Sequence, residues 1–207
     1  HTMRILTMLM ALMLGLLTVP GEENSSLAKK NGYVINLDRA EKLEKMTYSS
    51  LFSKAGIIVL EDTDESLLGK VDKLEVCDNN LYVLEKGRGL FLFNKQGKFI
   101  KMIGRQGKGP GEYIDPDDIS IDRENKKIYV LDSQTQNVLK YSGNGTFESS
   151  FKLENKGTRS TFIQPFKNAL YTNLYTFDKS GKRFLLSKVD VTNGKRISFQ
   201  FEASQYN

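Results

Sequence analysis

Two polar segments of the 207-residue chain hold residue types that could bind a ligand or act on one. The first is the glycine-rich segment Gly104–Gly111, which carries the cations Arg105 and Lys108. A glycine-rich loop binds phosphate when it ends in Gly-Lys-Ser/Thr and opens a helix, and neither feature follows this segment. We therefore predict a crossover between β-sheets, where glycine allows close backbone approach, with Arg105 and Lys108 available to an anionic ligand.

The second segment is a dense group of carboxylates, Asp115, Asp117, Asp118 and Asp122. Calcium loops follow the spacing Asp-x-Asp-x-Asp-Gly, which is absent here and is interrupted by Pro116. A pair of carboxylates could also serve a glycosidase, but among 25 acidic residues some pair will face each other by chance. We predict turn-capping carboxylates, with Asp117 and Asp118 as candidate ligand-binding residues, and we assign no catalytic residue and no metal site.

Aromatic and nucleophilic side chains add few candidates. Tyr113 and Tyr175 are predicted to be exposed and could stack on a sugar ring, whereas the single cysteine, Cys77, is predicted to be buried. The only histidine is His1, ahead of an apparent start at Met3. Ser-His-Asp triads, Cys-His dyads and His-ligated metal centres are therefore excluded, and we expect no cofactor.

The N-terminal segment predicts export. After Arg4 an apolar run extends from Ile5 to Leu17, which suits a signal peptide and is shorter than the roughly 20 residues of a transmembrane helix. Residues 1–21 are interpreted as cloning residues and a signal peptide, which leaves no membrane span in the mature chain. No cysteine follows the run, so we expect a periplasmic or cell-surface protein without a lipid anchor.

The charge balance does not indicate a nucleic-acid partner. Lys and Arg number 30 and Asp and Glu 25, for a net charge of +5, and no dense basic run is present.

The elements that must position these residues are short β-rich runs separated by turn residues, which predict an all-β fold. The strongest runs are Ile57–Leu60, Leu81–Leu84, Leu90–Phe93, Ile128–Leu131 and Phe184–Leu186. Turns rich in Asn, Asp and Gly are predicted at 78–80, 95–97, 123–125, 143–145, 179–181 and 192–194. The single helix candidate is Arg39–Lys45.

The strand pattern repeats along the chain. Tyr82 recurs as Tyr129, 47 residues later, and Gly97 recurs as Gly145, 48 residues later, with a weaker third copy near Ala169. A period in the forties with about four strands per unit is typical of β-propeller blades, with an open β-sandwich as the alternative. The chain has room for about three blades, whereas propellers close with four to eight.

Two stretches resemble a known family. The segment Gly104–Tyr113 and the residues that follow it resemble an NHL-type propeller repeat; these are Pro116, Ile119, Ile121 and Ile128-Tyr129-Val130-Leu131-Asp132. Together with Leu60–Gly69, they are similar to the exported six-bladed β-propeller proteins of gut Bacteroidetes. The resemblance spans about Tyr33–Phe201. It implies four-stranded antiparallel blades that make up three to four blades of a six-bladed ring.

The predicted organisation is a signal segment at 1–21, an N-terminal segment at 22–56 and propeller blades at 57–207. We expect a non-catalytic envelope protein that binds or scaffolds an unknown protein or glycan. Its candidate rim residues are Arg105, Lys108, Tyr113, Asp117 and Asp118. The alternatives are a carbohydrate- or peptide-directed lyase or hydrolase that uses carboxylate, Tyr and Lys, and a truncated fragment without independent activity. Open blade edges also predict self-association.

Overall fold

The computed structural model describes residues 45–154, 159–173, 176–177 and 182–202. The chain divides into two compact units, residues 1–54 and 55–207. In the first unit the described residues form one four-residue helix, α2 (Tyr48–Leu51), in which the Ser50 amide donates to the Thr47 carbonyl. The predicted helix Arg39–Lys45 lies outside the described residues, apart from Lys45.

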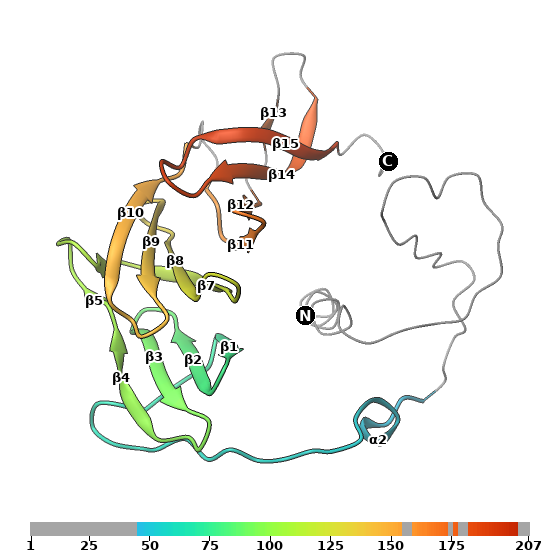
Figure 1. The fold of residues 1–207 in the computed structure, drawn as a ribbon, viewed down its shortest axis with the longest axis vertical. Helices are drawn as coiled ribbons and strands as arrows, with labels where there is room; N and C mark the ends of the chain where they lie inside the picture. Colours follow the sequence, from blue (N-terminus) through green and yellow to red (C-terminus); the bar gives the residue numbers. More distant parts are fainter. Residues whose placement is uncertain (1–44, 155–158, 174–175, 178–181, 203–207) are drawn as a thin grey trace. The chain divides into compact units, whose positions relative to one another are not determined.

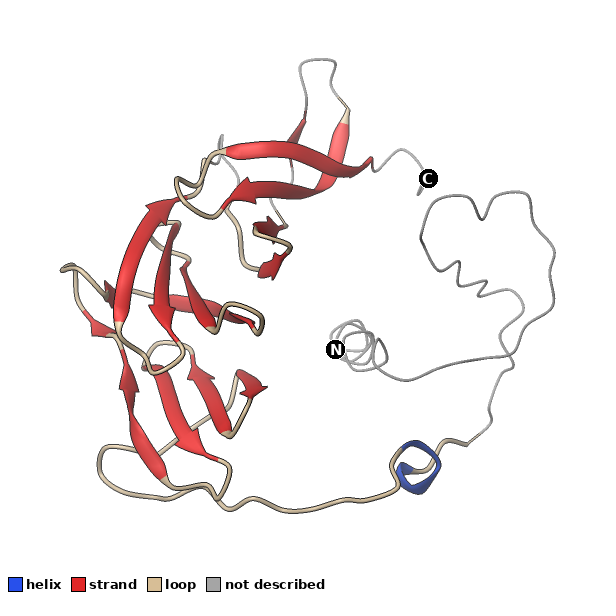
Figure 2. Ribbon diagram, viewed as in Figure 1, coloured by secondary structure: helices blue, strands red, loops and turns tan. Residues whose placement is uncertain are grey.

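The second unit confirms the all-β prediction and contains three antiparallel sheets, numbered here in chain order (Figure 1, Figure 2). Sheet 1 contains β1 (Lys73–Cys77), β2 (Asn80–Glu85), β3 (Gly89–Asn94) and β4 (Phe99–Ile103). Sheet 2 contains β7 (Pro116–Asp122), β8 (Lys127–Asp132), β9 (Asn137–Ser142) and β10 (Phe147–Lys152). Sheet 3 contains β11 (Ile163–Phe166), β12 (Ala169–Thr172), β13 (Thr176–Phe177), β14 (Arg183–Asp190) and β15 (Arg196–Glu202).

Strands that are consecutive in the chain pair with each other in sheets 1 and 2, so both sheets are simple meanders. Sheet 3 follows the same path through β11, β12, β14 and β15, and the short β13 pairs with β14 beside β12. Between sheets 1 and 2, β5 (Arg105–Gln106) and β6 (Glu112–Tyr113) form a parallel pair inside the glycine-rich crossover.

Glycines at positive φ close three of the predicted turns. Gly97, Gly145 and Gly194 have φ of 84°, 81° and 73°, a region in which glycine carries no side-chain penalty. Each lies between the last two strands of its sheet. The turn at 78–80 is also confirmed, with Asp78 at φ 53°, whereas the turn at 179–181 lies outside the described residues.

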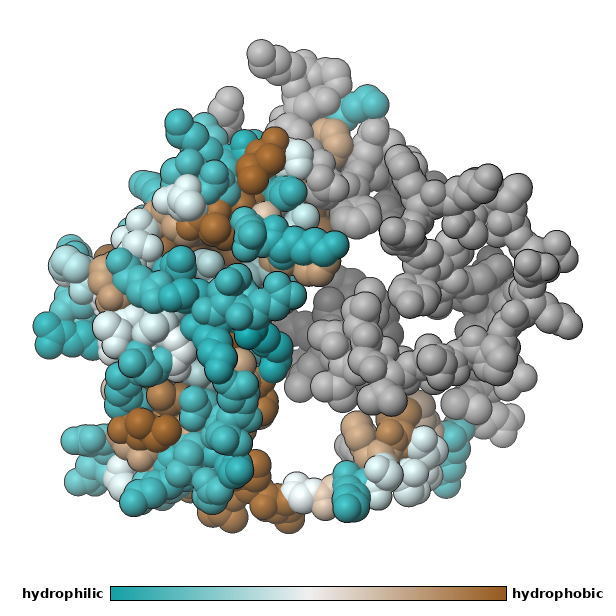
Figure 3. Space-filling view, viewed as in Figure 1, coloured by the Kyte–Doolittle hydropathy of each residue, from teal (hydrophilic) through white to brown (hydrophobic). Residues whose placement is uncertain are grey.

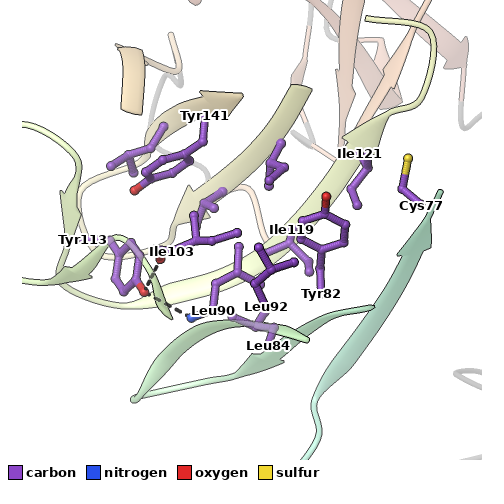
Figure 4. Packing of buried hydrophobic residues seen from close by; sticks show 13 residues of the cluster. Cys77, Tyr82, Leu84, Leu90, Leu92, Ile103, Tyr113, Ile119, Ile121 and Tyr141 are labelled. Atoms are coloured by element: carbon purple, nitrogen blue, oxygen red, sulfur yellow. Dashed lines mark hydrogen bonds between the residues drawn. The ribbon is translucent and has the colours of Figure 1, made fainter. Parts of the chain in front are cut away.

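Because side chains alternate along the strands, sheets 1 and 2 each have two apolar faces. Two of the core clusters lie between neighbouring sheets, and a third, of Leu81, Val83, Phe91 and Phe93, lies on the other face of sheet 1 against Leu60 and Leu68. The cluster between sheets 1 and 2 includes Tyr82, Leu84, Ile119 and Tyr141 (Figure 4). A second cluster, which includes Leu131 and Ile163, lies between sheets 2 and 3. Sheet 2 is therefore covered on both faces.

The prediction of a strand at Ile57–Leu60 is wrong. These residues lie in the segment before β1 and pair with no strand among the described residues. Ile57, Ile58 and Val59 are exposed. A β-branched run becomes a strand only where a neighbouring strand can accept and donate its backbone hydrogen bonds.

The first strands of the three sheets are neighbours, because β7 contacts both β1 and β11. Figure 1 shows β1, β7 and β11 along one side of the sheets, with β4 and β10 on the opposite side. No helix in the described part of the chain is long and apolar enough to span a membrane.

Candidate functional site

The neighbouring first strands bring polar side chains from three sheets together. We call this group the first-strand row, and its members are Lys73 and Glu75 of β1, Asp118 and Ser120 of β7, and Gln164 of β11. In a sheet interior these positions would be apolar. Here Lys73, Glu75 and Asp118 are charged and the other two members are neutral and polar, and all five lie on the edge strands of their sheets.

Asp118 is the centre of the row. Its Oδ1 lies 2.7 Å from Nζ of Lys73, and its Oδ2 accepts a hydrogen bond of 2.8 Å from the backbone amide of Ile163. One carboxylate therefore connects the first strands of all three sheets. The Asp118 side chain is almost fully buried, so both contacts are shielded from water.

Glu75 shares the same cation. Its Oε1 lies 3.9 Å from Nζ of Lys73, and its Oε2 lies 3.5 Å from Nη2 of Arg123, which also donates to the carbonyl of Val76. Lys73 therefore stands between two carboxylates, those of Glu75 and Asp118. Its ammonium group also lies 5.9 Å from the ring centroid of the exposed Phe162.

Burial raises the pKa of both carboxyl groups above their ordinary values. For Glu75 the loss of hydration outweighs the opposing effect of Lys73 and Arg123 on the pKa, and the nearby charge of Asp118 raises it further. For Asp118 burial likewise outweighs the ion pair with Lys73. Two carboxyl groups with raised pKa values therefore lie beside one ammonium group, a combination that marks a candidate functional site.

We predict that Glu75→Gln reduces the loss of stability that accompanies rising pH. Because the pKa of Glu75 is raised on folding, the folded state holds this proton more tightly than the unfolded chain does. The stability that this proton contributes is present below pH 4.5, the ordinary value, and is lost as the pH rises through the raised pKa. Urea unfolding at pH 4, 5, 6 and 7 measures the effect. Glu124→Gln, in an exposed turn, is the control, and equal pH profiles for the two variants would contradict the prediction.

The row ends in a neutral pair. Ser120 Oγ donates to Oε1 of Gln164 over 3.4 Å, and Gln164 is exposed. The row therefore offers an amide and a hydroxyl beside its charged members, a mixture of donors and acceptors that suits a polar ligand.

Of the residues predicted from the sequence, Asp117 and Asp118 lie at the start of β7, but only Asp118 belongs to the row. Asp117 instead pairs with Lys86 of the β2–β3 turn, with Oδ1 2.6 Å from Nζ. Arg105 lies on the crossover, where its Nε is 2.6 Å from Oε1 of Glu112, and Lys108 is exposed on the same loop. The structure does not bring Arg105 or Lys108 into the row.

The prediction that Tyr113 is exposed is wrong. Its ring is fully buried in the cluster between sheets 1 and 2. Its hydroxyl accepts from the amide of Leu90 over 3.1 Å and donates to the carbonyl of Ile103 over 2.9 Å (Figure 4). Tyr113 therefore joins the ends of β3 and β4 and cannot stack on a ligand. Tyr175, the other predicted stacking residue, lies outside the described residues.

The glycine-rich segment runs from β4 to β7 as the predicted crossover. Gly104 and Gly111 have φ of 68° and 74°, and a Cβ atom on Gly104 would lie 2.6 Å from the Tyr113 ring. At the end of the crossover, the amide of Ile114 donates to Oδ2 of Asp132 over 2.8 Å. In the preceding repeat, the segment that leads to sheet 1 makes the equivalent contact: the amide of Gly69 donates to Oε2 of Glu85 over 3.3 Å.

Sequence reasoning missed Lys73, Glu75, Ser120 and Gln164 as site residues. A signal for the first two was present, because the repeat aligns Lys73 with Asp118 and Glu75 with Ser120. Gln164 lies in the weaker third copy of the repeat and has no such signal.

Cys77 is buried at the end of β1, as predicted. Within the described ranges, no three His, Cys, Asp or Glu side chains are grouped so that they could hold a metal ion.

The chain is similar to two solved structures from Bacteroides. One is described as a "putative exported protein" from Bacteroides fragilis NCTC 9343; it is 25% identical with a TM-score of 0.60, over 70% of this chain and 41% of that one. The other is a member of the DUF4221 family from Bacteroides vulgatus ATCC 8482, 10% identical with a TM-score of 0.48, over 70% of this chain and 48% of that one. The chain thus spans less than half the length of either structure.

The description of the Bacteroides fragilis protein agrees with the export predicted from the N-terminal segment. No curated protein matches the chain. Residues 32–206, most of the sequence, match the family model described as "Domain of unknown function (DUF4934)", and the chain therefore belongs to the DUF4934 family.

Proposed function

We propose that this chain is part of an exported, non-catalytic β-propeller that binds a polar ligand of the cell envelope at its first strands. The three sheets, with their shared repeat, would be consecutive blades of a six-bladed, NHL-like ring whose central channel is lined by first strands. The similarity to a longer Bacteroides protein supports this view, because that protein has room for further repeats. In this organisation residues 1–21 are the export signal, 22–56 lead into the first blade and 57–207 form blades, in the periplasm or at the cell surface.

The observation that carries the proposal is the first-strand row. Asp118 is contacted by groups from the first strands of two other sheets, so the row is a property of the assembled sheets rather than of one loop. Glycans and peptides present alternating hydroxyl, amide and carbonyl groups, which match the carboxylate, ammonium and amide groups of the row. A polar ligand in the channel would replace the water around Glu75 and Gln164.

Isothermal titration of the full chain with envelope glycans and peptides tests the proposal. A ligand of the row is expected to bind without being converted, and Gln164→Ala is expected to weaken it about tenfold, roughly 1.4 kcal/mol. Gln96→Ala, in the exposed turn between β3 and β4, is the matched control and should bind normally. No binding across the panel, or equal binding by both variants, would contradict a ligand site at the row.

A second candidate function follows from Lys73 standing between Glu75 and Asp118. Two carboxyl groups with raised pKa values beside a lysine could act as the general acid and base of a carbohydrate- or peptide-directed lyase or hydrolase. This function predicts that the bound ligand is cleaved and that Glu75→Gln abolishes product formation while binding persists. Chromatography of the ligand after incubation with the protein separates the two functions.

A further inference from the structure

Residues 57–60 follow the path that the outer strand β10 takes beside sheet 3. A Cβ atom placed on Gly194 of sheet 3 would overlap the carbonyl oxygen of Lys152, at the end of the outer strand β10 of sheet 2. In sheet 1, a Cβ atom on the equivalent Gly97 would overlap the carbonyl oxygen of Val59 in the same manner. Val59 therefore stands where the outer strand of a preceding sheet would end.

Two hydrogen bonds at each of these junctions show the same correspondence. The amide of Glu154 donates to the carbonyl of Gly194 over 3.3 Å, and the amide of Glu61 donates to the carbonyl of Gly97 over 2.7 Å. The side-chain Oε2 of Glu154 accepts from the amide of Arg196 over 3.4 Å, and that of Glu61 accepts from the amide of Phe99 over 2.8 Å. Each pair of contacts joins the end of one outer segment to the last turn of the next sheet.

These matches align Glu61 with Glu154, and so align Ile57–Leu60 with Ser150–Leu153. Most of the latter segment belongs to β10, which pairs with β9 through Ser149, Ser150, Phe151 and Lys152. Ile57–Leu60 has the position of an outer strand and its β-branched composition, but among the described residues it has no third strand beside it. Figure 3 shows apolar residues at the lower edge of the view, where Figure 1 shows the segment before β1.

On the adjoining face of sheet 1, Leu60 and Leu68 pack against the buried side chains of β2 and β3, while the β1 part of this face is exposed. Leu74 and Val76 of β1 are 49% and 46% exposed, although Ile119 and Ile121, their equivalents in β7, are 0% and 6% exposed. The β7 pair is covered by sheet 1, in the cluster that also contains Tyr82, Leu84, Leu90 and Leu92. Within the described part of the chain, no sheet covers Leu74 and Val76 as sheet 1 covers their equivalents.

From these two observations we infer that Ile57–Leu60 and the face of sheet 1 around Leu74 and Val76 form one docking surface, and that its occupant is a three-stranded antiparallel sheet of the same repeat. The occupant packs an apolar face on Leu74 and Val76, and the free edge of its third strand pairs with Ile57–Leu60, which becomes its fourth strand. The inference rests on the repeat architecture of the proposed function but not on the ligand of the first-strand row.

A second intact copy of the chain does not fit this surface. Its sheet 3 already ends in β15, so the edge of β14 is covered and the position for Ile57–Leu60 is filled. A copy that ends at Asp190 exposes that edge. The docking surface therefore distinguishes an incomplete sheet from a complete one.

Mixing two forms of the protein tests the inference. The host is the full chain, and the probe is a copy that ends at Asp190 and carries Ile58→Asp, so that it offers an edge but no strand of its own. Sedimentation velocity is expected to show a one-to-one complex, and hydrogen exchange is expected to show protection of the amides of residues 57–60. Ile58→Asp in the host should weaken the complex at least tenfold. Ile100→Asp is the matched control, because Ile58 and Ile100 are 50% and 49% exposed, and it should leave the affinity unchanged.

A probe that unfolds cooperatively but forms no complex overturns the inference. Equally strong association between two intact copies also overturns it, because the surface would then accept a complete sheet. If the probe does not unfold cooperatively, a cyclised peptide of residues 127–142, the hairpin of β8 and β9, replaces it. Absence of protection at residues 57–60 by that peptide is then the contradicting result. Gln164→Ala should leave the complex intact, so failure of docking and failure of the ligand site are distinguishable.

Discussion

Gly104→Ala is expected to lower the free energy of unfolding by about 3–5 kcal/mol, from a left-handed backbone and from overpacking. Gly104 has φ of 68°, and an added Cβ would lie 2.6 Å from Cε1 of Tyr113 and 2.6 Å from the hydroxyl oxygen of Tyr141. Neither ring can retreat, because both are buried and the Tyr141 hydroxyl donates to the carbonyl of Gly111 over 3.1 Å. Denaturant unfolding measures the change.

Gly87→Ala is the matched control for this substitution. Gly87 also has a positive φ, 81°, but an added Cβ would meet nothing within 4 Å. It is expected to cost about 1 kcal/mol, the conformational part alone. If the two variants lose similar amounts of unfolding free energy, the crossover can move to accommodate the added methyl group. That result would contradict the close approach of Gly104 to the two tyrosines.

Tyr113→Phe is expected to lower the free energy of unfolding by about 2–4 kcal/mol, because it leaves a buried donor and a buried acceptor unpaired. The Tyr113 hydroxyl stands between the amide of Leu90 and the carbonyl of Ile103, which are register partners in β3 and β4. Burial raises the pKa of Tyr113 to about 12, so the hydroxyl keeps its proton at neutral pH. The loss should therefore be the same at pH 6 and pH 8.

Tyr82→Phe is the control for the loss of a tyrosine hydroxyl. The Tyr82 hydroxyl donates to the carbonyl of Gly143 over 2.9 Å, in a turn that solvent reaches. Water can replace this bond, so the expected cost is only about 0.5–1.5 kcal/mol. Thermal melts of both variants compare the two hydroxyls, and a Tyr113→Phe loss no larger than that of Tyr82→Phe would contradict the bridging role.

Much of the fold was predictable from the sequence because its signals are local. The runs Leu81–Leu84 and Ile128–Leu131 are strands, and the turns at Gly97 and Gly145 lie where glycine permits a positive φ. The repeat of 47 residues predicted successive sheets with the same strand order. The crossover role of Gly104–Gly111 was also predictable, because no helix or P-loop ending follows it.

The candidate site was predicted only in part. Asp118 was identified from the density of carboxylates around it, but its partners Lys73 and the Ile163 amide lie 45 residues away on either side. Neighbouring carboxylates of this segment have different partners, because Asp117 pairs with Lys86 and only Asp118 belongs to the row. Sequence proximity therefore indicated the right segment without indicating which side chains meet.

Alternation, turn chemistry and the repeat determined by themselves that this protein is an all-β chain of successive antiparallel sheets, because each acts within a few residues or at a fixed interval. Only the tertiary structure decided that Tyr113 is buried between two sheets and that Lys73 meets Asp118. It also decided that Ile57–Leu60 has no strand beside it. Burial, ion pairing and strand pairing depend on which surfaces lie opposite each other, and that is settled only when the sheets pack together.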